Sequence, residues 1–380
     1  MKTKTLADIT LTLFFTGGIS LKTWSDVGNL NRELELYNQL AQDLKAVNIV
    51  SYGEKRDREY AKHLGAINLL STTWHNSPTR TILHLLSKHL AQIYGSDILK
   101  TNQIPGSEIP IWLKKHMGKK LIVRCGYLHS YFIKKQSRDQ KTINDAIRLE
   151  KNAFSYADMG IVTTSWQREL VIKLYAIDPA KITVIPNYVV TDAFKPDPET
   201  KKEYDLIFVG RAGRQKNLGN LLKAIHYLKT KNRVLSLLMV GGCCNDTDIK
   251  ELVNQYALNV TFKGNIPNFN LPHIINQAKA FILPSYYEGH PKVLLEAMSC
   301  GIPCIGSDVT GIREDIDHMK TGYLCETDYK SIATAIDTVL SDDSLQRTMG
   351  KNAREHILKK YSIDKIVKLE LEVIQAVIAK

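Results

Sequence analysis

Short runs of apolar residues alternate with longer amphipathic segments along the whole chain. In the first half, the segments between the runs have the spacing of helices, for example residues 30–43 and 143–157. The apolar runs predict strands over residues 9–15, 47–50, 66–70, 97–99, 120–123, 159–162 and 182–185. This alternation is typical of βαβ units, which build parallel sheets.

The second half repeats the pattern more clearly. Strands are predicted over residues 205–209, 235–240, 260–263, 280–283 and 303–307. Helices are predicted over residues 218–228, 248–256, 271–277 and 291–298. A last helix, 363–379, follows a polar break at Tyr361-Ser362 and need not belong to the second sheet.

A segment rich in proline and charge, residues 186–203, separates the halves and reads as an interdomain linker. We therefore expect an α/β fold of two Rossmann-like domains, 1–187 and 188–362, followed by the helix 363–380. Two such domains that face each other form a cleft at the carboxyl ends of their strands, where ligands bind.

The composition is that of a globular protein, with 44% hydrophobic and 24% charged residues. No apolar run approaches the roughly 20 residues that span a bilayer. Asp8 interrupts the first apolar stretch, and Thr16-Gly17-Gly18 follows it, which argues against a signal peptide and for a cytoplasmic protein. The six cysteines form no Cys-x-x-Cys pair, so we expect most of them to be buried thiols rather than parts of a zinc site or of disulfides.

The net charge of +12 lies mostly in the first half, because residues 1–190 carry +10 and residues 191–380 carry +2. The excess is concentrated between Lys114 and Arg148. Such a surface attracts anionic membrane, nucleic acid or an acidic substrate. A solvated basic face that binds nothing is the alternative interpretation.

A cationic turn follows the predicted strand 205–209. Backbone amides at the start of the next helix suit an anion, and Arg211 and Lys216 add charge where a diphosphate needs it. The alternative is a surface loop with spare cations, because Gly210-x-x-Gly213 alone is a weak signal.

A second strand-turn-helix segment, residues 283–298, carries two glutamates. Glu288 is expected in the turn, and Glu296 is expected to project from about the second helical turn, partly covered by its apolar neighbours. Pro291 suits the first helical turn, and Gly289 allows a ligand to approach the backbone amides near His290. A carboxylate is a natural acceptor for a vicinal diol such as that of ribose.

With these residues the chain resembles the retaining, GT-B-fold glycosyltransferases of the large group 1, or family 4, type, which includes glycogen synthases. The match is dense from about residue 150 to 345. The matching features are the Glu288/Glu296 pair, Gly210-Arg211 with Lys216-Asn217, the Ile185-Pro186-Asn187-Tyr188-Val189 segment, the unit from Glu150 to Ser165, and the loop Thr16-Gly17-Gly18.

The resemblance implies a role for each matched residue. Arg211 and Lys216 would neutralise the donor diphosphate in place of a metal ion, so no cofactor is expected. Glu296 would hold the ribose hydroxyls, and Glu288 would support the transferred sugar. The remaining donor-binding residues would be Gly17, Gly18, Gly210, Lys263, Gly264, Gly289, His290, Pro291, Lys292 and Val293.

The resemblance also implies domain roles and substrates. The first domain would bind the acceptor and the second the nucleotide sugar, and the last helix would cross back to the first domain. The expected reaction moves a hexose or N-acetylhexosamine from a UDP sugar, or a GDP sugar, to a glycan or lipid-linked acceptor in cell-surface polysaccharide or glycoconjugate synthesis. The basic region suggests a peripheral place on the cytoplasmic face of a membrane.

One departure leaves an assignment open. The family often has a histidine at the end of a strand in the first domain, beside the transferred sugar. Here Arg124 occupies that position and His129 follows in the loop. Either side chain could take the role.

Two other protein classes remain as alternatives. A nucleotide-sugar epimerase shares the architecture, but no convincing acid-base set surrounds a sugar site. A basic nucleic-acid-binding protein is disfavoured because aromatic residues do not interleave with cations in a recognised module. Asp246-Thr247-Asp248 has the letters of a metal motif but is better explained as a helix cap, and Asp315-Ile316-Asp317 is expected to be a surface pair at a helix end.

Overall fold

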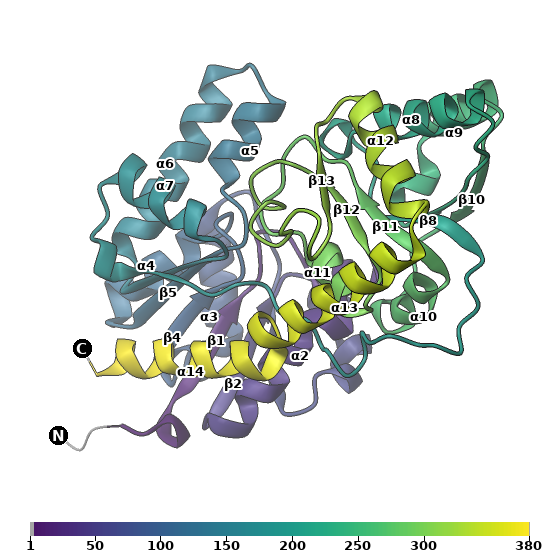
Figure 1. Ribbon diagram of the computed structural model, residues 1–380. Helices are drawn as coiled ribbons and strands as arrows, with labels where there is room; N and C mark the ends of the chain where they lie inside the picture. The colour runs from purple at the N-terminus through teal and green to yellow at the C-terminus, as the bar shows by residue number, and fades with distance from the viewer. Residues whose placement is uncertain (1–3, 380) are drawn as a thin grey trace. The chain divides into compact units, whose positions relative to one another are not determined.

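Two parallel sheets form the framework of the computed structural model, which describes residues 4–379 (Figure 1). Residues 1–3 and 380, which the predicted domain ranges include, lie outside the described part. The first sheet has the order β3-β2-β1-β4-β5-β6-β7. Its strands are β1 (Thr10–Phe14), β2 (Ala46–Ser51), β3 (Ile67–Ser71), β4 (Ile98–Thr101), β5 (Lys120–Cys125), β6 (Met159–Val162) and β7 (Ile182–Val184).

The strand order of this sheet reverses between β1 and β4. Thr10 to Phe14 pair with Ala46 to Val50 of β2 on one side, and β4 pairs with β1 on the other. Loops on the carboxyl side of such a switch point commonly bind ligands, and the loop after β1 carries Gly17 and Gly18. The helices of this part are α1 (Leu21–Asp26), α2 (Leu30–Asp43), α3 (Pro78–Tyr94), α4 (Glu108–Met117), α5 (His129–Gln136), α6 (Gln140–Tyr156) and α7 (Ser165–Tyr175).

The second sheet has the order β10-β9-β8-β11-β12-β13. Its strands are β8 (Tyr204–Val209), β9 (Ser236–Val240), β10 (Asn259–Lys263), β11 (Ala278–Leu283), β12 (Cys304–Ser307) and β13 (Tyr323–Cys325). Its helices are α8 (Leu218–Thr230), α9 (Thr247–Gln255), α10 (Leu271–Asn276), α11 (Lys292–Ser299), α12 (Tyr329–Leu340) and α13 (Asp343–Lys360).

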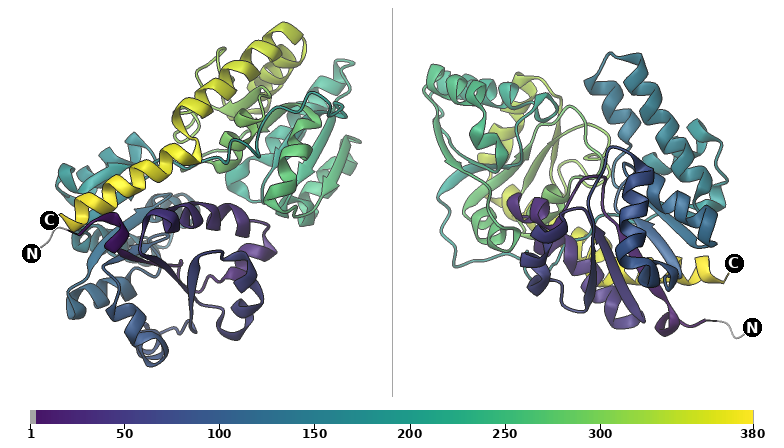
Figure 2. Two further views of the ribbon diagram at one scale, coloured as in Figure 1. Left: turned by 90° about the horizontal axis from the view of Figure 1, so that it is seen from below. Right: turned by 180° about the vertical axis from the view of Figure 1, so that it is seen from behind.

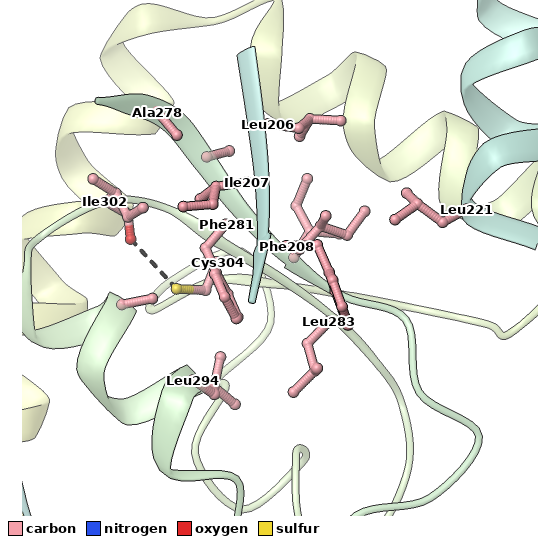
Figure 3. Packing of buried hydrophobic residues seen from close by; sticks show 14 of the residues in the cluster. Leu206, Ile207, Phe208, Leu221, Ala278, Phe281, Leu283, Leu294, Ile302 and Cys304 are labelled. Carbon is pink, nitrogen blue, oxygen red and sulfur yellow. Dashed lines mark hydrogen bonds between the residues drawn. The ribbon is translucent and has the colours of Figure 1, made fainter. Parts of the chain in front are cut away.

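The core of the second sheet is apolar on both faces. Leu206, Ile207 and Phe208 follow one another in β8 and are all fully buried. Because successive strand residues point to opposite faces, both faces must be covered, as is usual for parallel sheets. Figure 3 shows this packing around Phe281, where the Cys304 thiol donates to the Ile302 carbonyl oxygen at 3.5 Å. All six cysteines are buried free thiols, which confirms the sequence prediction.

Packing divides the chain into two compact units, residues 1–186 with 366–380 and residues 187–365. The last helix, α14 (Ile363–Ile378), therefore begins in unit 2 and continues in unit 1 (Figure 2). In unit 1 the carboxylate of Glu370 on α14 lies 2.6 Å from the ammonium of Lys100 on β4, with both side chains buried. Within residues 4–379 no helix combines the length and apolar composition needed to cross a membrane.

Candidate functional site

Three loops meet at the carboxyl ends of β8, β9 and β10 in unit 2. The amide of Gly241, after β9, donates to the carbonyl oxygens of Lys263 and Gly264, at 3.0 Å each. A Cβ on Gly241 would lie 2.8 Å from the carbonyl oxygen of Gly210, so only glycine allows this approach. The predicted residues Gly210, Lys263 and Gly264 thus lie in one loop cluster.

The loop after β8 turns sharply before α8. Gly213 has a φ of +145° and Asn217 a φ of +55°, a conformation that asparagine tolerates better than most residues. The Asn217 amide group donates to the carbonyl oxygens of Pro284 at 2.9 Å and Thr327 at 2.7 Å. These bonds tie the loop to those that follow β11 and β13. Arg211 remains exposed on this loop, whereas Lys216 is largely buried.

Glu288 is the centre of the polar cluster in unit 2. Its carboxylate accepts hydrogen bonds from Lys216 Nζ at 2.6 Å, Ser285 Oγ at 2.6 Å and Gln215 Nε2 at 3.1 Å. The Glu288 side chain is 7% exposed and that of Lys216 is 13% exposed. Charge-assisted bonds of this kind are short and strong. The structure therefore brings the predicted Lys216 and Glu288 together.

Gln215 and Ser285 are missing from the predicted set. Gln215 lies beside Lys216 and Ser285 three positions before Glu288, and each has an uncharged side chain of a type that is common in surface loops. Their burial is the distinguishing feature, and burial in a loop leaves no periodic signal in the sequence.

The start of α11 differs slightly from the prediction. Pro291 is the N-cap, with ψ at 106°, and the helix begins at Lys292, so the placement of Pro291 in the first helical turn is wrong. An extended Pro291 lets the turn containing Gly289 continue to the helix. The first amides of a helix, here those of Lys292 and Val293, have no intrahelical acceptor, and such amides suit an anionic or hydroxyl ligand.

Glu296 projects from the second turn of α11, as predicted, but it is 1% exposed rather than partly covered. Its Oε1 accepts a hydrogen bond from Asn268 Nδ2 at 2.9 Å. Asn268 follows the loop after β10 and was not predicted. Glu296 is thus a buried carboxylate on α11 that this bond joins to the segment after β10.

The prediction that Asp315 and Asp317 both lie on the surface is wrong for Asp315. Residues 308–315 form turns rather than a helix end, and Asp315 is 1% exposed whereas Asp317 is exposed. Asp315 Oδ2 lies 3.2 Å from Nε2 of His290, which is also buried. By contrast, the capping interpretation of the other aspartate pair is confirmed, because Asp246 caps α9 and accepts from the Ile249 amide at 3.1 Å.

In unit 1, the glycine loop after β1 packs closely against an aromatic ring. A Cβ on Gly17 would lie 2.7 Å from Trp74 Cη2, and Gly18 has a φ of +74°. The Gly17 amide donates to the Pro105 carbonyl oxygen at 2.9 Å. Glycine is therefore needed at both predicted positions for steric or conformational reasons.

Arg124 and His129 occupy different elements of unit 1. Arg124 is buried near the end of β5, where its amide donates to Thr101 Oγ1 at 3.0 Å. His129 is the first residue of α5 and is half-buried. Burial lowers the pKa of His129 below its usual value, and the nearby Glu150 opposes this shift. His129 thus has the environment of a neutral imidazole.

Comparison with known proteins gives a family and several relatives. The family model described as "Glycosyl transferases group 1" matches residues 189–356. The chain is 31% identical over 301 residues to N-acetyl-alpha-D-glucosaminyl L-malate synthase of Bacillus anthracis, covering 75% of this chain and 76% of the relative. It is 32% identical over 233 residues to UDP-Gal:alpha-D-GlcNAc-diphosphoundecaprenol alpha-1,3-galactosyltransferase of Escherichia coli, covering 54% of this chain and 58% of the relative.

Two solved structures support the fold. Sucrose-phosphate synthase from Thermosynechococcus elongatus matches with a TM-score of 0.79 and 22% identity, covering 98% of this chain and 99% of that one. HepE of Anabaena, solved in complex with UDP-glucose, matches with a TM-score of 0.77 and 15% identity, covering 97% of this chain and all of the other. The expected GT-B fold class, with two parallel sheets and their helices, is confirmed.

Proposed function

The chain belongs to the group 1 glycosyltransferase family, and on this basis we propose that it transfers a hexose or N-acetylhexosamine from a nucleoside-diphosphate sugar with retention of configuration. The proposed acceptor is a glycan or a lipid-linked sugar used in cell-surface polysaccharide or glycoconjugate synthesis. The buried Lys216–Glu288 pair with its neutral donors carries this proposal, because it places a cation beside a fixed carboxylate in the loop cluster of unit 2.

The donor would lie across the loops of unit 2. Lys216 and Arg211 would bind the diphosphate, supplying the positive charge that a metal ion supplies elsewhere. Glu296 would accept hydrogen bonds from the ribose hydroxyls, and Glu288 would contact the transferred sugar. The loop at Lys263 and Gly264 would lie beside the base.

The proposed reaction breaks the bond between the anomeric carbon and the diphosphate oxygen. The acceptor oxygen forms the new bond on the same face of the sugar, and its proton passes to the departing phosphate oxygen. No protein nucleophile is needed for this step. Lys216 stabilises the negative charge on the leaving group, while Glu288 stabilises the oxocarbenium-like sugar.

UDP is the favoured nucleotide, with GDP as the alternative. The E. coli relative is named for UDP-galactose, and the HepE structure holds UDP-glucose. The residues of the proposed site recognise ribose and diphosphate, which UDP and GDP share. The base therefore has to be found by experiment.

A nucleotide screen tests the donor site. At 100 times its dissociation constant, UDP should stabilise the wild type by about 2.7 kcal/mol. Replacing Glu296 by alanine should abolish this stabilisation, because the ribose hydroxyls lose their acceptor. Thermal shift with UDP, GDP and their sugars, with EDTA present throughout, measures both effects.

The matched control is Glu251→Ala, which removes an exposed glutamate from α9. It should retain the full UDP shift. The absence of any nucleotide-dependent shift in the wild type would contradict the proposed function, and a shift that needs added metal would contradict metal independence.

A basic surface on unit 1 is consistent with the proposed lipid-linked acceptor. Helices α5 and α6 form a hairpin that projects beyond the sheet (Figure 1). Around its tip the exposed cations are Lys134, Lys135, Arg138 and Lys141. Half-buried aromatic rings lie beside them, with the Tyr131 and Trp166 ring centroids 5.1 Å apart. We propose that this hairpin binds the anionic cytoplasmic face of a membrane, where a lipid-linked acceptor would be held.

Charge reversal of Lys134, Lys135 and Lys141 tests this surface. Each basic residue near an anionic membrane contributes about 1 kcal/mol, so reversal to glutamate should weaken binding to phosphatidylglycerol-containing vesicles by roughly 100-fold or more. The control reverses Lys201, Lys231 and Lys250, which are exposed in unit 2 and give the same change in net charge. Equal binding by the two triple variants in a vesicle flotation assay would refute the membrane surface.

A further inference from the structure

A buried polar cluster lies directly behind the turn that carries Glu288. Its centre is the imidazole of His290, which is 5% exposed as a residue and 1% exposed in its side chain. The other members are Asn187, Asp315 and Tyr361, none more than 6% exposed. These residues come from four separate segments of unit 2, so the cluster joins the turn to three other parts of the unit.

The hydrogen bonds of His290 define its tautomer. Nδ1 accepts the backbone amide of Asn187 at 3.0 Å, so this nitrogen carries no proton. In the neutral ring, Nε2 then carries the proton and donates to Asp315, whose oxygens lie 3.2 and 3.3 Å away. The ring is thereby fixed at both nitrogens. A carboxylate that orients an imidazole through its far nitrogen is a common way of holding one tautomer.

Tyr361 completes the support of Asp315. Burial raises the pKa of Tyr361 far above its usual value, and the adjacent Asp315 raises it further, so the phenol stays neutral beside that carboxylate. The Tyr361 ring also packs edge-on against His290, with centroids 5.4 Å apart. The Asp315 carboxylate therefore lies in the interior next to the His290 imidazole and the neutral Tyr361 phenol.

The backbone of the turn is held by the same surroundings. Asn187 Nδ2 donates to the carbonyl oxygen of His290 at 2.6 Å. Gly311, with a φ of +89°, packs so tightly that a Cβ there would collide with the Gly289 carbonyl oxygen and lie 2.7 Å from that of Glu288. The Glu288 turn is thus clamped by Asn187 on one side and by the 311–315 segment on the other.

A buried ionic cluster is a poor way to gain stability, because apolar residues of similar volume often stabilise a protein as well or better. What such a cluster provides is a fixed geometry. Fixed geometry matters in an active site because small displacements of the reacting groups lower the activity. We propose that His290 is a positioning residue, which acts through Asp315, Tyr361 and Asn187 to hold Glu288 in the orientation required for sugar transfer. This inference rests on the proposed function of Glu288.

The test compares substitutions of the imidazole. His290→Phe keeps the ring volume and removes both hydrogen bonds, so kcat should fall by roughly 10- to 100-fold. The dissociation constant for UDP should change by less than about threefold, because the proposed diphosphate and ribose contacts are made by Arg211, Lys216 and Glu296. His290→Gln, whose amide can still donate to Asp315, should recover most of kcat. His226→Phe, on α8 where the ring stacks on Tyr256, is the matched control and should behave as wild type.

Two further measurements keep the proposal open to refutation. Should His290→Phe fold poorly, Tyr361→Phe removes a single hydroxyl and should lower kcat about 3- to 10-fold at unchanged UDP affinity. Hydrogen exchange of residues 284–291 should be faster in both phenylalanine variants and restored in His290→Gln.

Unchanged kcat in both phenylalanine variants would overturn the positioning role, as would equal losses in the phenylalanine and glutamine variants of His290. Unchanged exchange at residues 284–291 would overturn it as well, whatever the donor is. Failure of the wild type to bind any nucleotide would instead overturn the proposed function, and the exchange measurement would still decide whether His290 holds the turn.

Discussion

Replacing Lys216 by methionine should lower kcat by about 10²- to 10³-fold, the usual cost of removing one preorganised group that stabilises transition-state charge. The ammonium lies 2.6 Å from Glu288 Oε1 in a largely buried position, where electrostatic interactions are screened less than in water. Methionine keeps the length and apolar stem of the side chain and removes the charge. Steady-state kinetics with saturating donor, alongside calorimetric binding of UDP, measure the effect.

The control for Lys216 is Lys223→Met, an exposed lysine on the following helix α8, which should leave kcat unchanged. The variant Glu288→Gln and the double variant complete a thermodynamic cycle. Because the two side chains contact each other, their effects should not add. A Lys216→Met enzyme that keeps more than a tenth of wild-type kcat would contradict the role of Lys216 on the leaving diphosphate.

The strands were predictable because buried parallel strands are continuous apolar runs. Every predicted strand is present within two residues of its expected ends, and β8 shows why, since helices cover both of its faces. Strand β13 was missed because its apolar run, Tyr323–Cys325, has only three residues between Gly322 and Glu326, whereas the equally short β7 lies in the longer predicted run 182–185.

The candidate site was predictable where its residues are neighbours in sequence. Glu288 and Glu296 share one strand-turn-helix segment, so their spacing alone places one in the turn and the other on the helix. Gln215 and Asn268 could not be found in this way, because they reach the glutamates from 73 and 28 positions away. Those contacts exist only after the sheet has brought its loops together.

Asp315 shows a different limit. Its pairing with Asp317 predicted an exposed acidic pair at a helix end, and its neighbours Glu314 and Asp317 are indeed exposed. Asp315 is buried because the turn at Gly311 packs on the backbone of Glu288 and Gly289 and directs the segment inward. The buried polar cluster behind the Glu288 turn is therefore formed by the fold, and the local sequence pattern does not predict it.

The ion pair between Lys100 and Glu370 should produce the largest change in stability. Both side chains are at most 1% exposed, and Glu370 lies on α14 among the buried residues Ile366 and Ile374. Burial lowers the pKa of Lys100, and Glu370 opposes this shift. Removing either partner leaves an uncompensated charge in the interior, which typically costs 3–5 kcal/mol.

We therefore expect Lys100→Met to lower the free energy of unfolding of unit 1 by about 3–5 kcal/mol, and Lys100→Met with Glu370→Met to recover most of that loss. The recovery follows because two apolar side chains leave no buried charge without a partner. Urea denaturation measures the free energy of unfolding. Hydrogen exchange of β4 and α14 reports the stability of unit 1 separately from that of the rest of the chain. Lys22→Met, which breaks the exposed pair with Asp26, should leave the free energy of unfolding nearly unchanged. A double variant no more stable than Lys100→Met would show that α14 is held to unit 1 by the ion pair itself and not by its apolar face.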